Sequence, residues 1–223
     1  VTNFAVMDVN NQAVLDGYTT FSEGNTKVYS SHAYNKIFST LSSGTGKYYV
    51  EALVHSDGFQ YMGVAPDAYV SNVDDYTGYL TQNNPHVWAL YNSDSSSSDG
   101  KVYHNGVAQE DLGSIGTDTV VHIALDVNHS KAYFGMNGVW SGDPAAGTGG
   151  HDISDDRWYF AQGYRDWVTW NFGQDATFAG ERVSPGYRPY DNWGRFHYEP
   201  PAGYRALLTA SIECQGNCLD DLG

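Results

Sequence analysis

Hydrophobic and polar residues alternate along several stretches of this chain with a period of two, the repeat of a β-strand that buries one face. In residues 121–127 every second residue is Val, Ile or Leu, whereas His122, Ala124 and Asp126 fill the positions between them. No stretch keeps the 3.6-residue repeat of an amphipathic helix, so the pattern predicts an all-β fold. Runs rich in β-branched and aromatic residues predict further strands at Lys47–Val54 and at residues 59–64, 76–81, 86–91, 101–103, 107–109, 132–136, 158–163 and 167–172.

Turn-forming residues separate these strands at short intervals. The Asn-Gly pairs at 105–106 and 137–138 are typical of tight hairpin turns, in which both central residues adopt positive φ. Residues 158–163 and 167–172 are predicted to pair around a turn at 164–166, and every second residue of 167–172 from Val168 onward is apolar, which nominates that face for the core. Many short antiparallel strands at this spacing indicate a sandwich or a barrel.

Composition agrees with one β-rich globular domain. The 223 residues include 18 Tyr, 6 Trp and 25 Gly, and only 17% are charged. A chain of this length buries about 70% of the surface of its unfolded form, so it needs no crosslinks to fold. We therefore expect a single domain over residues 1–212, followed by an acidic tail or truncated linker at 213–223. The first residue is Val and no secretory signal precedes the strands, which indicates a processed chain or an excised fragment.

Negative charge narrows the range of partners. The chain carries 26 Asp and Glu against 11 Lys and Arg, which gives a net charge of −15. Such a field repels phosphate backbones and anionic lipids, so we expect neither nucleic-acid binding nor membrane insertion. The sequence also lacks the apolar run of about 20 residues that a membrane helix needs. The acidic residues are scattered, which is typical of a solvated acidic surface.

No catalytic motif is apparent. Sandwich glycosidases of the laminarinase type carry Glu-x-Asp-x-x-Glu on one strand, and none of the six Glu residues here has an Asp two positions later. A Gly-x-Ser-x-Gly elbow, a His-Glu-x-x-His pair and a P-loop are absent as well. We therefore expect a protein that is not an enzyme. A glycosidase without a recognisable motif stays open as an alternative, with Glu51 and Glu110 as its candidate carboxylates.

The sequence predicts no cofactor, although calcium stays open. Asp94 and Asp99 bracket a serine-rich loop, but this loop lacks the alternating acidic ligands of a calcium-binding loop. Cys214 and Cys218 lie close together near the end of the chain. They are compatible with a disulfide, with free thiols or, given two more ligands, with a metal site.

Five motifs follow one another along the chain and cover most of residues 1–212. They are Gly-Lys-Tyr-Tyr-Val-Glu at 46–51, Met-Gly-Val-Ala at 62–65, a strand ending in Leu-Asp before a strand ending in Asn-Gly at 120–140, the pair at 158–161 and 168–174 that ends in Asn-Phe-Gly-Gln, and Pro-Pro-Ala-Gly-Tyr-Arg-Ala-Leu at 200–207. Taken in this order, the motifs resemble the SPRY family. A resemblance to this family implies a concanavalin-like jelly roll of two antiparallel sheets that serves as a non-enzymatic binding module.

Two further features refine the resemblance. Residues 3–8 and 137–149 are similar to a subgroup encoded by bacteriophages, which implies a virion-surface or extracellular location. Residues 175–195 are inserted where relatives need only a few residues, and we expect a self-packed lid or an assembly contact there. The aromatic side chains available for either role are Tyr187, Tyr190, Trp193 and Phe196.

Loops at one end of the sandwich are the expected binding site, by position in the SPRY family and because loops on a rigid scaffold often carry recognition. Tyr, Trp and Arg dominate interface hot spots, which favours the turn around residue 165. The alternative is that Trp167 packs on the sheet and Arg165 pairs with Asp166. The candidate binding residues are Tyr91, Asp94, Asp99, Tyr164, Arg165, Asp166 and Trp167.

Three functions remain in competition. The first is a fibre, tail or capsid component of a bacteriophage that assembles with copies of itself or with other virion proteins. The second is a lectin or receptor-binding protein that recognises a host-surface glycan through exposed aromatic rings. The third is the glycosidase without a recognisable motif. The missing carboxylate trio favours the first two over the third.

Overall fold

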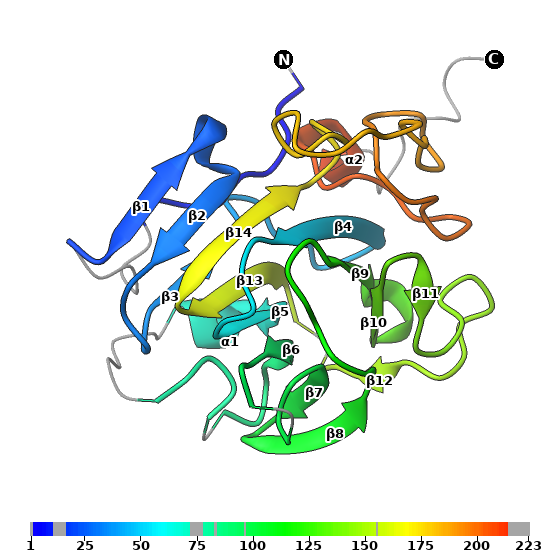
Figure 1. Cartoon of the computed structure of the whole chain (residues 1–223). Helices are drawn as coiled ribbons and strands as arrows, with labels where there is room; N and C mark the ends of the chain where they lie inside the picture. The colour runs from blue at the N-terminus through cyan, green and yellow to red at the C-terminus, as the bar shows by residue number, and fades with distance from the viewer. Residues whose placement is uncertain are drawn as a thin grey trace, which may run out of the picture.

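Two antiparallel β-sheets pack face to face (Figure 1) in the computed structural model, which describes residues 2–10, 17–71, 78–82, 84–95, 97–154 and 156–213. The larger sheet has the order β1-β2-β14-β4-β9-β10-β11, and β12 also pairs with β10. The smaller sheet has the order β3-β13-β5-β6-β7-β8. The prediction of an all-β, antiparallel two-sheet sandwich is confirmed.

The strands of the larger sheet are β1 (Thr19–Ser22), β2 (Lys27–Ser30), β4 (Lys47–Val54), β9 (Val120–Asp126), β10 (Lys131–Met136), β11 (Val139–Trp140), β12 (His151–Asp152) and β14 (Asp166–Asn171). Those of the smaller sheet are β3 (Lys36–Phe38), β5 (Gln60–Pro66), β6 (Trp88–Asn92), β7 (Lys101–His104), β8 (Val107–Asp111) and β13 (Trp158–Tyr164). Helical turns are short, namely η1 (Glu23–Asn25), α1 (Asp67–Val70), η2 (Val127–His129) and α2 (Thr209–Glu213). Among the described residues no helix has the length and apolar character needed to span a bilayer.

The main core lies between the two sheets and follows the alternation seen in the sequence. Val121, Ile123 and Leu125 of β9 are buried there, as is the face of β14 that carries Val168 and Trp170, together with Phe172. Met62 and Val64 of β5 approach them from the smaller sheet. Burial of large apolar side chains from both sheets supplies the main stabilisation of the fold.

Tight turns form where the Asn-Gly pairs predict them. Asn105 and Gly106 connect β7 to β8 with φ values of +50° and +73°. Asn137 and Gly138 connect β10 to β11 with φ values of +48° and +82°. Both pairs therefore have the positive φ at two consecutive residues that this kind of hairpin requires.

Residues 158–172 differ from the prediction, because the two strands around residue 165 do not pair with each other. β13 pairs with β3 and β5 in the smaller sheet, whereas β14 pairs with β2 and β4 in the larger one. The turn at residues 164–166 therefore carries the chain from one sheet to the other. Periodicity could not show this, because a strand that pairs with its sequence neighbour and one that changes sheet alternate in the same way.

The strand predicted at residues 76–81 is also wrong where it can be compared. Residues 78–82 form turns, and residues 76 and 77 lie outside the described part of the chain. The strands β1, β2 and β3 were not predicted, because each is only three or four residues long. Runs this short do not show a clear alternation.

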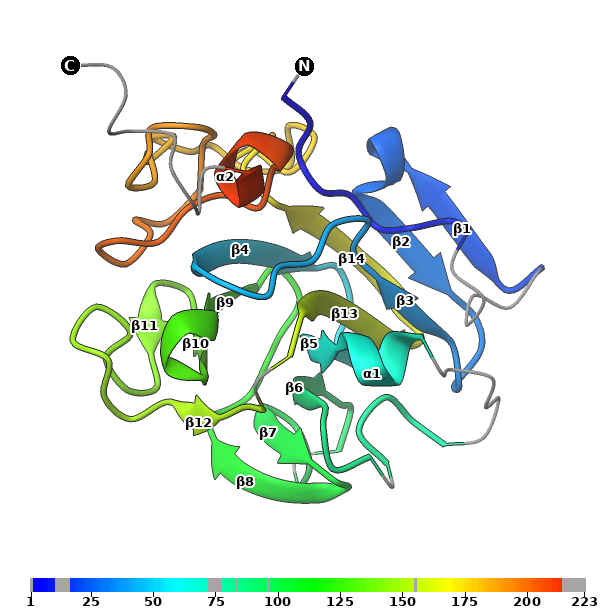
Figure 2. The same cartoon turned by 180° about the vertical axis from the view of Figure 1, so that it is seen from behind.

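A third layer covers the outer face of the larger sheet. The segment that follows β14, drawn from yellow to red, lies along this sheet in both views (Figures 1 and 2). Phe178 is buried against Leu53 and Val120. Phe196 is buried in a second cluster that contains Tyr49 and Tyr204. The inner strands β4 and β9 are consequently buried on both faces.

Candidate functional site

The turn at residues 164–166 is held tightly against the segment that precedes β5. Tyr164 and Asp166 both have positive φ, at +77° and +70°. The Arg165 N–H donates to the Phe59 carbonyl at 2.7 Å, and the Phe59 N–H donates to the Asp166 carboxylate at 3.3 Å. Gly58 leaves room for that carboxylate, because a Cβ at this position would lie 2.1 Å from Asp166 Oδ2. The turn therefore presents its side chains in a fixed arrangement.

Tyrosine side chains from several strands meet on the outer face of the smaller sheet, next to this turn. Tyr61 and Tyr91 are register partners on β5 and β6, and their rings stack with centroids 4.2 Å apart. The Tyr164 ring meets Tyr79 edge-on at 4.8 Å, and Tyr103 of β7 lies 5.8 Å from Tyr91. We call the following set the tyrosine surface: Phe59, Tyr61, Tyr79, Tyr91, Tyr103, Tyr164 and Arg165.

The tyrosine surface has a buried base and an accessible rim. Tyr61 and Tyr164 keep 6% and 7% of their surface exposed, whereas Tyr79, Tyr91 and Tyr103 are half-buried. Arg165 is exposed, and its guanidinium lies over the rings of Phe59 and Tyr164 at 5.4 Å and 5.3 Å. Cation–π contacts of this kind hold the long side chain against the aromatic face. The arrangement combines fixed aromatic area with one exposed cation.

The pKa values of Tyr61, Tyr79 and Tyr91 are raised above that of an ordinary tyrosine. Burial raises the pKa of Tyr61 and of Tyr91 well above the ordinary value for tyrosine. For Tyr79, a hydrogen bond with the Tyr164 side chain is the main cause of a raised pKa. The tyrosine surface is therefore uncharged apart from Arg165 at physiological pH.

The structure separates the candidate binding residues into two groups. Tyr91, Tyr164 and Arg165 come together on the tyrosine surface, but Trp167 lies on the outer face of the larger sheet. There the Trp167 ring packs 5.0 Å from Tyr29, and the Lys27 ammonium lies 5.6 Å from its centroid. Trp167 thus packs on the sheet, half-buried and tilted by 34° against Tyr29, which gives little support to a sugar platform at this residue.

Arg165 and Asp166 behave differently from the predicted ion pair. Arg165 lies over aromatic rings, and the Asp166 carboxylate accepts a backbone N–H instead. Each side chain is therefore occupied by another partner. Tyr164 and Asp166, on either side of Arg165, both have a left-handed backbone conformation, and the Arg165 and Asp166 side chains contact different neighbours.

Asp94 and Asp99 do not converge on one site. Asp99 is buried, and its carboxylate accepts the N–H groups of Ser93 and Ile115 at 3.3 Å and 3.0 Å. It ties the serine-rich loop to the chain that leads into β9, whereas Asp94 is exposed. Across the described residues no three His, Cys, Asp or Glu side chains gather in a way that could hold a metal ion. Cys214 and Cys218 lie outside the described residues.

A second group of polar residues crosses the outer face of the larger sheet. Asn171, Glu51, His122, Gly135 and Trp140 are successive register partners on β14, β4, β9, β10 and β11. All five point away from the main core, toward the segment that forms the third layer. The sequence showed the outward position of His122 but could not place these residues in one row, because strand order is not encoded in the alternation.

Glu51 joins the third layer to the sheet. Its carboxylate accepts the backbone N–H groups of His197 and Tyr198 at 2.8 Å and 2.7 Å. It also accepts the Tyr49 hydroxyl at 2.9 Å and the Asn171 amide at 3.1 Å. The side chain has no exposed surface, and desolvation raises its pKa to about 7 against the effect of these four donors. This carboxylate is enclosed, and it acts as a structural link.

His122 is likewise buried, and its ring depends on the glycine beside it. A Cβ on Gly135 would lie 2.2 Å from the imidazole, so only glycine leaves room for the ring. His122 Nε2 accepts the Gly138 N–H at 3.0 Å, and Trp140 meets the ring at 4.2 Å. Desolvation lowers the pKa of His122 to about 3, so the imidazole is neutral at physiological pH.

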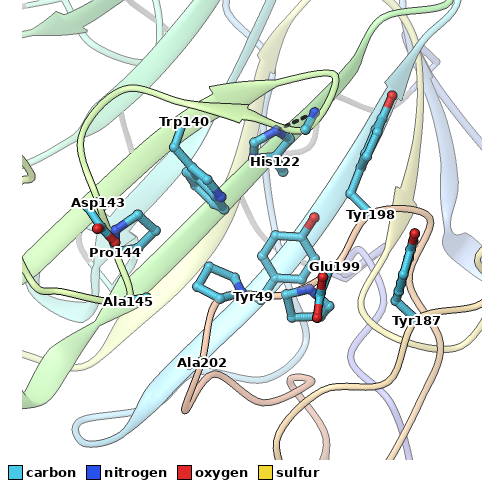
Figure 3. A pocket seen from close by; sticks show the side chains of 13 residues that line it. Tyr49, His122, Trp140, Asp143, Pro144, Ala145, Tyr187, Tyr198, Glu199 and Ala202 are labelled. Atoms are coloured by element: carbon cyan, nitrogen blue, oxygen red, sulfur yellow. Dashed lines mark hydrogen bonds between the residues drawn. The ribbon is translucent and has the colours of Figure 1, made fainter.

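A pocket of about 490 Å³ opens above this row (Figure 3). Trp140 and Pro144 stand on one side of it and Tyr187 and Tyr198 on the other, with Tyr49 between them. The first side comes from the β10–β11 region and the second from the third layer. This pocket was not predictable from the sequence, because its two walls are more than 40 residues apart along the chain. We call it the outer pocket.

The candidate glycosidase carboxylates do not form an acid/base pair. Glu51 is enclosed by donors and does not line the outer pocket. Glu110 lies on β8, in the smaller sheet, and contacts His151 at 3.1 Å. Glycoside hydrolysis needs two carboxyl groups on either side of one bond, and these two residues lie on different sheets.

The inserted segment buries different aromatics from those expected. Of the four candidates only Phe196 is buried, and Phe178 supplies the second anchor. Tyr187, Tyr190 and Trp193 keep 42%, 66% and 52% of their surface exposed. Phe178 and Phe196 therefore supply the packing of this segment, and the three exposed residues stay candidates for the assembly contact.

No protein-family model matches the chain, and no curated protein matches it either. Among solved structures, the PSpry domain of TRIM65 aligns with a TM-score of 0.52 at 14% identity, covering 76% of this chain and 91% of that one. The fold is that of a SPRY β-sandwich. Stonustoxin also aligns, with a TM-score of 0.52 at 16% identity, over 76% of this chain and 27% of its own. The SPRY domain of human HERC1 gives a TM-score of 0.49 at 15% identity, over 68% of this chain and 91% of that chain.

At these identities the likeness to SPRY domains is one of fold. It confirms the architecture expected from the sequence motifs, and the function has to be argued from the surfaces of this chain. Tyr61, Tyr79 and Tyr103 belong to its aromatic surface but were not among the predicted site residues. Outward positions on β5 and β7 were readable from the alternation, but their meeting with Tyr91 required the strand order of the smaller sheet.

Proposed function

We propose that this chain is a non-enzymatic interaction module that binds a protein partner through the tyrosine surface. The observation that carries the proposal is the stacked and edge-on network of tyrosines with Arg165 laid over its border. Tyr and Arg are enriched at interface hot spots, because they bring a large contact area and few rotamers to order. Here the rings already support one another, so binding costs little further side-chain entropy.

The absence of catalytic geometry at Glu51 and Glu110 supports a binding role. Glu51 accepts four hydrogen bonds within the fold and lies outside the outer pocket. The test is an assay for β-glucan hydrolysis by the purified chain. Hydrolysis that disappears in the Glu110→Gln variant would contradict the proposal.

We further propose that the partner at the tyrosine surface is another coat or tail protein of a bacteriophage particle, and that the chain resides at the virion surface. The support is the similarity of residues 3–8 and 137–149 to phage-encoded SPRY proteins. The net charge of −15 also suits a surface that stays hydrated and soluble when displayed in many copies.

Site-specific photocrosslinking tests the contact surface. Benzoylphenylalanine replaces Tyr91 on the tyrosine surface or, as a matched control, Val183, which is 96% exposed and lies outside it. The chain is then irradiated in its native assembly, and crosslinked peptides are identified by mass spectrometry. We expect one dominant protein partner from position 91, reduced by Arg165→Ala, and none from position 183. Equal crosslinking from both positions would contradict the proposed surface.

Exposed aromatics of the third layer support a second contact, used for assembly. Tyr190 and Trp193 are more than half exposed, although the Arg205 guanidinium lies 5.7 Å from the centroid of the Tyr190 ring. Sedimentation velocity over a range of concentrations tests this proposal. We expect self-association that Trp193→Ser weakens and that Tyr91→Ser leaves unchanged, whereas a chain that stays monomeric throughout would contradict it.

A further inference from the structure

The outer pocket is lined by aromatic rings set at steep angles to one another. The Tyr49 and Trp140 rings lie 6.0 Å apart and are inclined at 61°. Tyr198 faces them across the opening, and Tyr187 stands beside it (Figure 3). Rings set in this way present several π-faces to one enclosed space. The negative potential of such faces attracts a cation.

The charged residues in the lining are negative. Asp143 and Glu199 are exposed at the border of the pocket, and none of the described Lys or Arg residues lines it. His122, below the opening, is neutral at physiological pH because burial lowers its pKa to about 3. The lining therefore carries two carboxylates and no described cationic side chain, inside a chain whose net charge is −15. This distribution favours a cation over a neutral or an anionic ligand.

The walls are fixed before any ligand enters. Trp140 rests on His122 at 4.2 Å, and Pro144 and Pro200 are buried. The Asp143 carboxylate accepts the Ala146 N–H at 2.9 Å, which holds it at the border of the pocket. A preformed site of this kind loses little conformational entropy on binding. Its volume of about 490 Å³ lies within the range of small-molecule sites.

We propose that the outer pocket binds an organic ammonium ion of the quaternary methylammonium type. Its methyl groups contact the rings of Trp140, Tyr187 and Tyr198 above the buried Tyr49 ring, and Asp143 and Glu199 attract its charge from the border. Methylated ammonium groups suit an aromatic site because they are weakly hydrated and need no hydrogen-bond acceptor. This site is separate from the tyrosine surface, so its test is independent of the test of the proposed partner contact.

A sugar fits the same lining less well. Sugar hydroxyl groups both donate and accept hydrogen bonds, so the two carboxylates can accept from them, but a neutral sugar has no charge for these carboxylates to attract. The Tyr49 hydroxyl already donates to Glu51. Sugar binding is therefore the main competing outcome of the test.

The test compares choline with its uncharged carbon analogue, 3,3-dimethylbutan-1-ol, by isothermal titration calorimetry on the full chain. We expect the dissociation constant for choline to be lower by about tenfold, the size of a partly desolvated cation–π contribution. Trp140→Leu should abolish choline binding, whereas Trp193→Leu, a tryptophan outside the pocket, should leave it unchanged. Peptides with trimethylated and unmodified lysine, titrated in parallel, show whether the group comes from a protein or from a free metabolite.

A charge variant keeps the test valid if Trp140→Leu fails to fold. Asp143→Asn with Glu199→Gln changes two exposed side chains and keeps an oxygen that accepts the Ala146 N–H. We expect this double variant to bind choline severalfold more weakly and with less dependence on salt. Three results would each overturn the proposal. They are equal binding of choline and its carbon analogue, tighter binding of methyl glucoside than of choline, and no detectable choline binding at about 50 mM ligand.

Discussion

The outer faces of the two sheets differ although both belong to strands with the same alternation. On the larger sheet a third layer buries Tyr49 and His122 and leaves an aromatic pocket at its border. On the smaller sheet the tyrosines are only half-buried, and Arg165 lies over their border. One face is therefore stabilised within the chain, whereas the other keeps its aromatic area available to a partner. Aromatic residues on an outer face thus have two distinct uses in this protein.

Removing an anchor of the third layer should have the largest effect on stability. Phe196 has no exposed surface and meets the Tyr49 ring at 4.8 Å. Phe196→Ala should lower the free energy of unfolding by about 3 to 5 kcal/mol, as for other buried aromatics. Tyr91→Ala on the tyrosine surface should cost about 1 kcal/mol, since its ring is half solvated. Urea denaturation measures both, and equal losses would remove the distinction between the two faces.

The pH dependence of stability should reveal the link at Glu51. Its pKa is about 7 in the folded chain and close to 4.5 in the unfolded one, so the folded chain binds a proton more tightly. The associated stability is present below pH 4.5 and is lost as the pH rises through 7. We expect a loss of about 3 kcal/mol over that window, from 1.36 kcal/mol for each pKa unit.

Glu51→Gln is the control for this pH dependence. The variant loses a favourable acceptor at every pH, but its stability should not decline between pH 4.5 and 8 in the manner of the unmodified chain. Urea denaturation in a pH series measures the slope of the free energy of unfolding against pH in the two proteins. A slope that is the same in both proteins would show that another group causes it.

Adding a methyl group next to His122 should lower the stability of the fold by a smaller amount. Gly135→Ala places a Cβ 2.2 Å from the imidazole and 2.5 Å from the Val139 carbonyl oxygen, so the ring and the neighbouring backbone have to shift. Overpacking of this kind typically costs about 1 to 3 kcal/mol. Gly116→Ala, at a site where no atom lies within 4 Å of the added Cβ, should change stability by less than about 0.5 kcal/mol. Thermal unfolding of the two variants gives the comparison.

The smallest effect on stability is expected at Arg165. This side chain is exposed and contacts rings that also support one another, so Arg165→Ala should change the free energy of unfolding by less than about 0.5 kcal/mol. Binding to the partner should nevertheless weaken about tenfold or more, as for truncated hot-spot residues. Surface plasmon resonance against the crosslinked partner measures the change. Unaltered binding would place the contact elsewhere.

Much of the fold could be predicted from the sequence, because single strands and their turns are local features. The strand Lys47–Val54 has the predicted bounds, and the Asn-Gly pairs form the predicted turns. The order of the motifs also indicated the SPRY fold. The change of sheet at residues 164–166 was not predictable, since it depends on the pairing of β13 with β5 and of β14 with β4.

The candidate site could be predicted only in part for the same reason. Tyr91, Tyr164 and Arg165 were nominated for their residue types, and they do meet. Trp167, two residues after Arg165 in the sequence, lies on the other sheet because the chain changes sheets between them. The partners of Glu51 come from residues 197 and 198, and no local pattern links positions this far apart.

The most direct test of the central claim is hydroxyl-radical footprinting of the chain when free and when held in its native assembly. We expect assembly to protect Tyr79, Tyr91 and Tyr103, which are partly accessible in the free chain. Phe178 and Phe196 should resist modification in both states, because the third layer already buries them. Unchanged modification of the three tyrosines on assembly would contradict the claim that the tyrosine surface is where this module meets its partner.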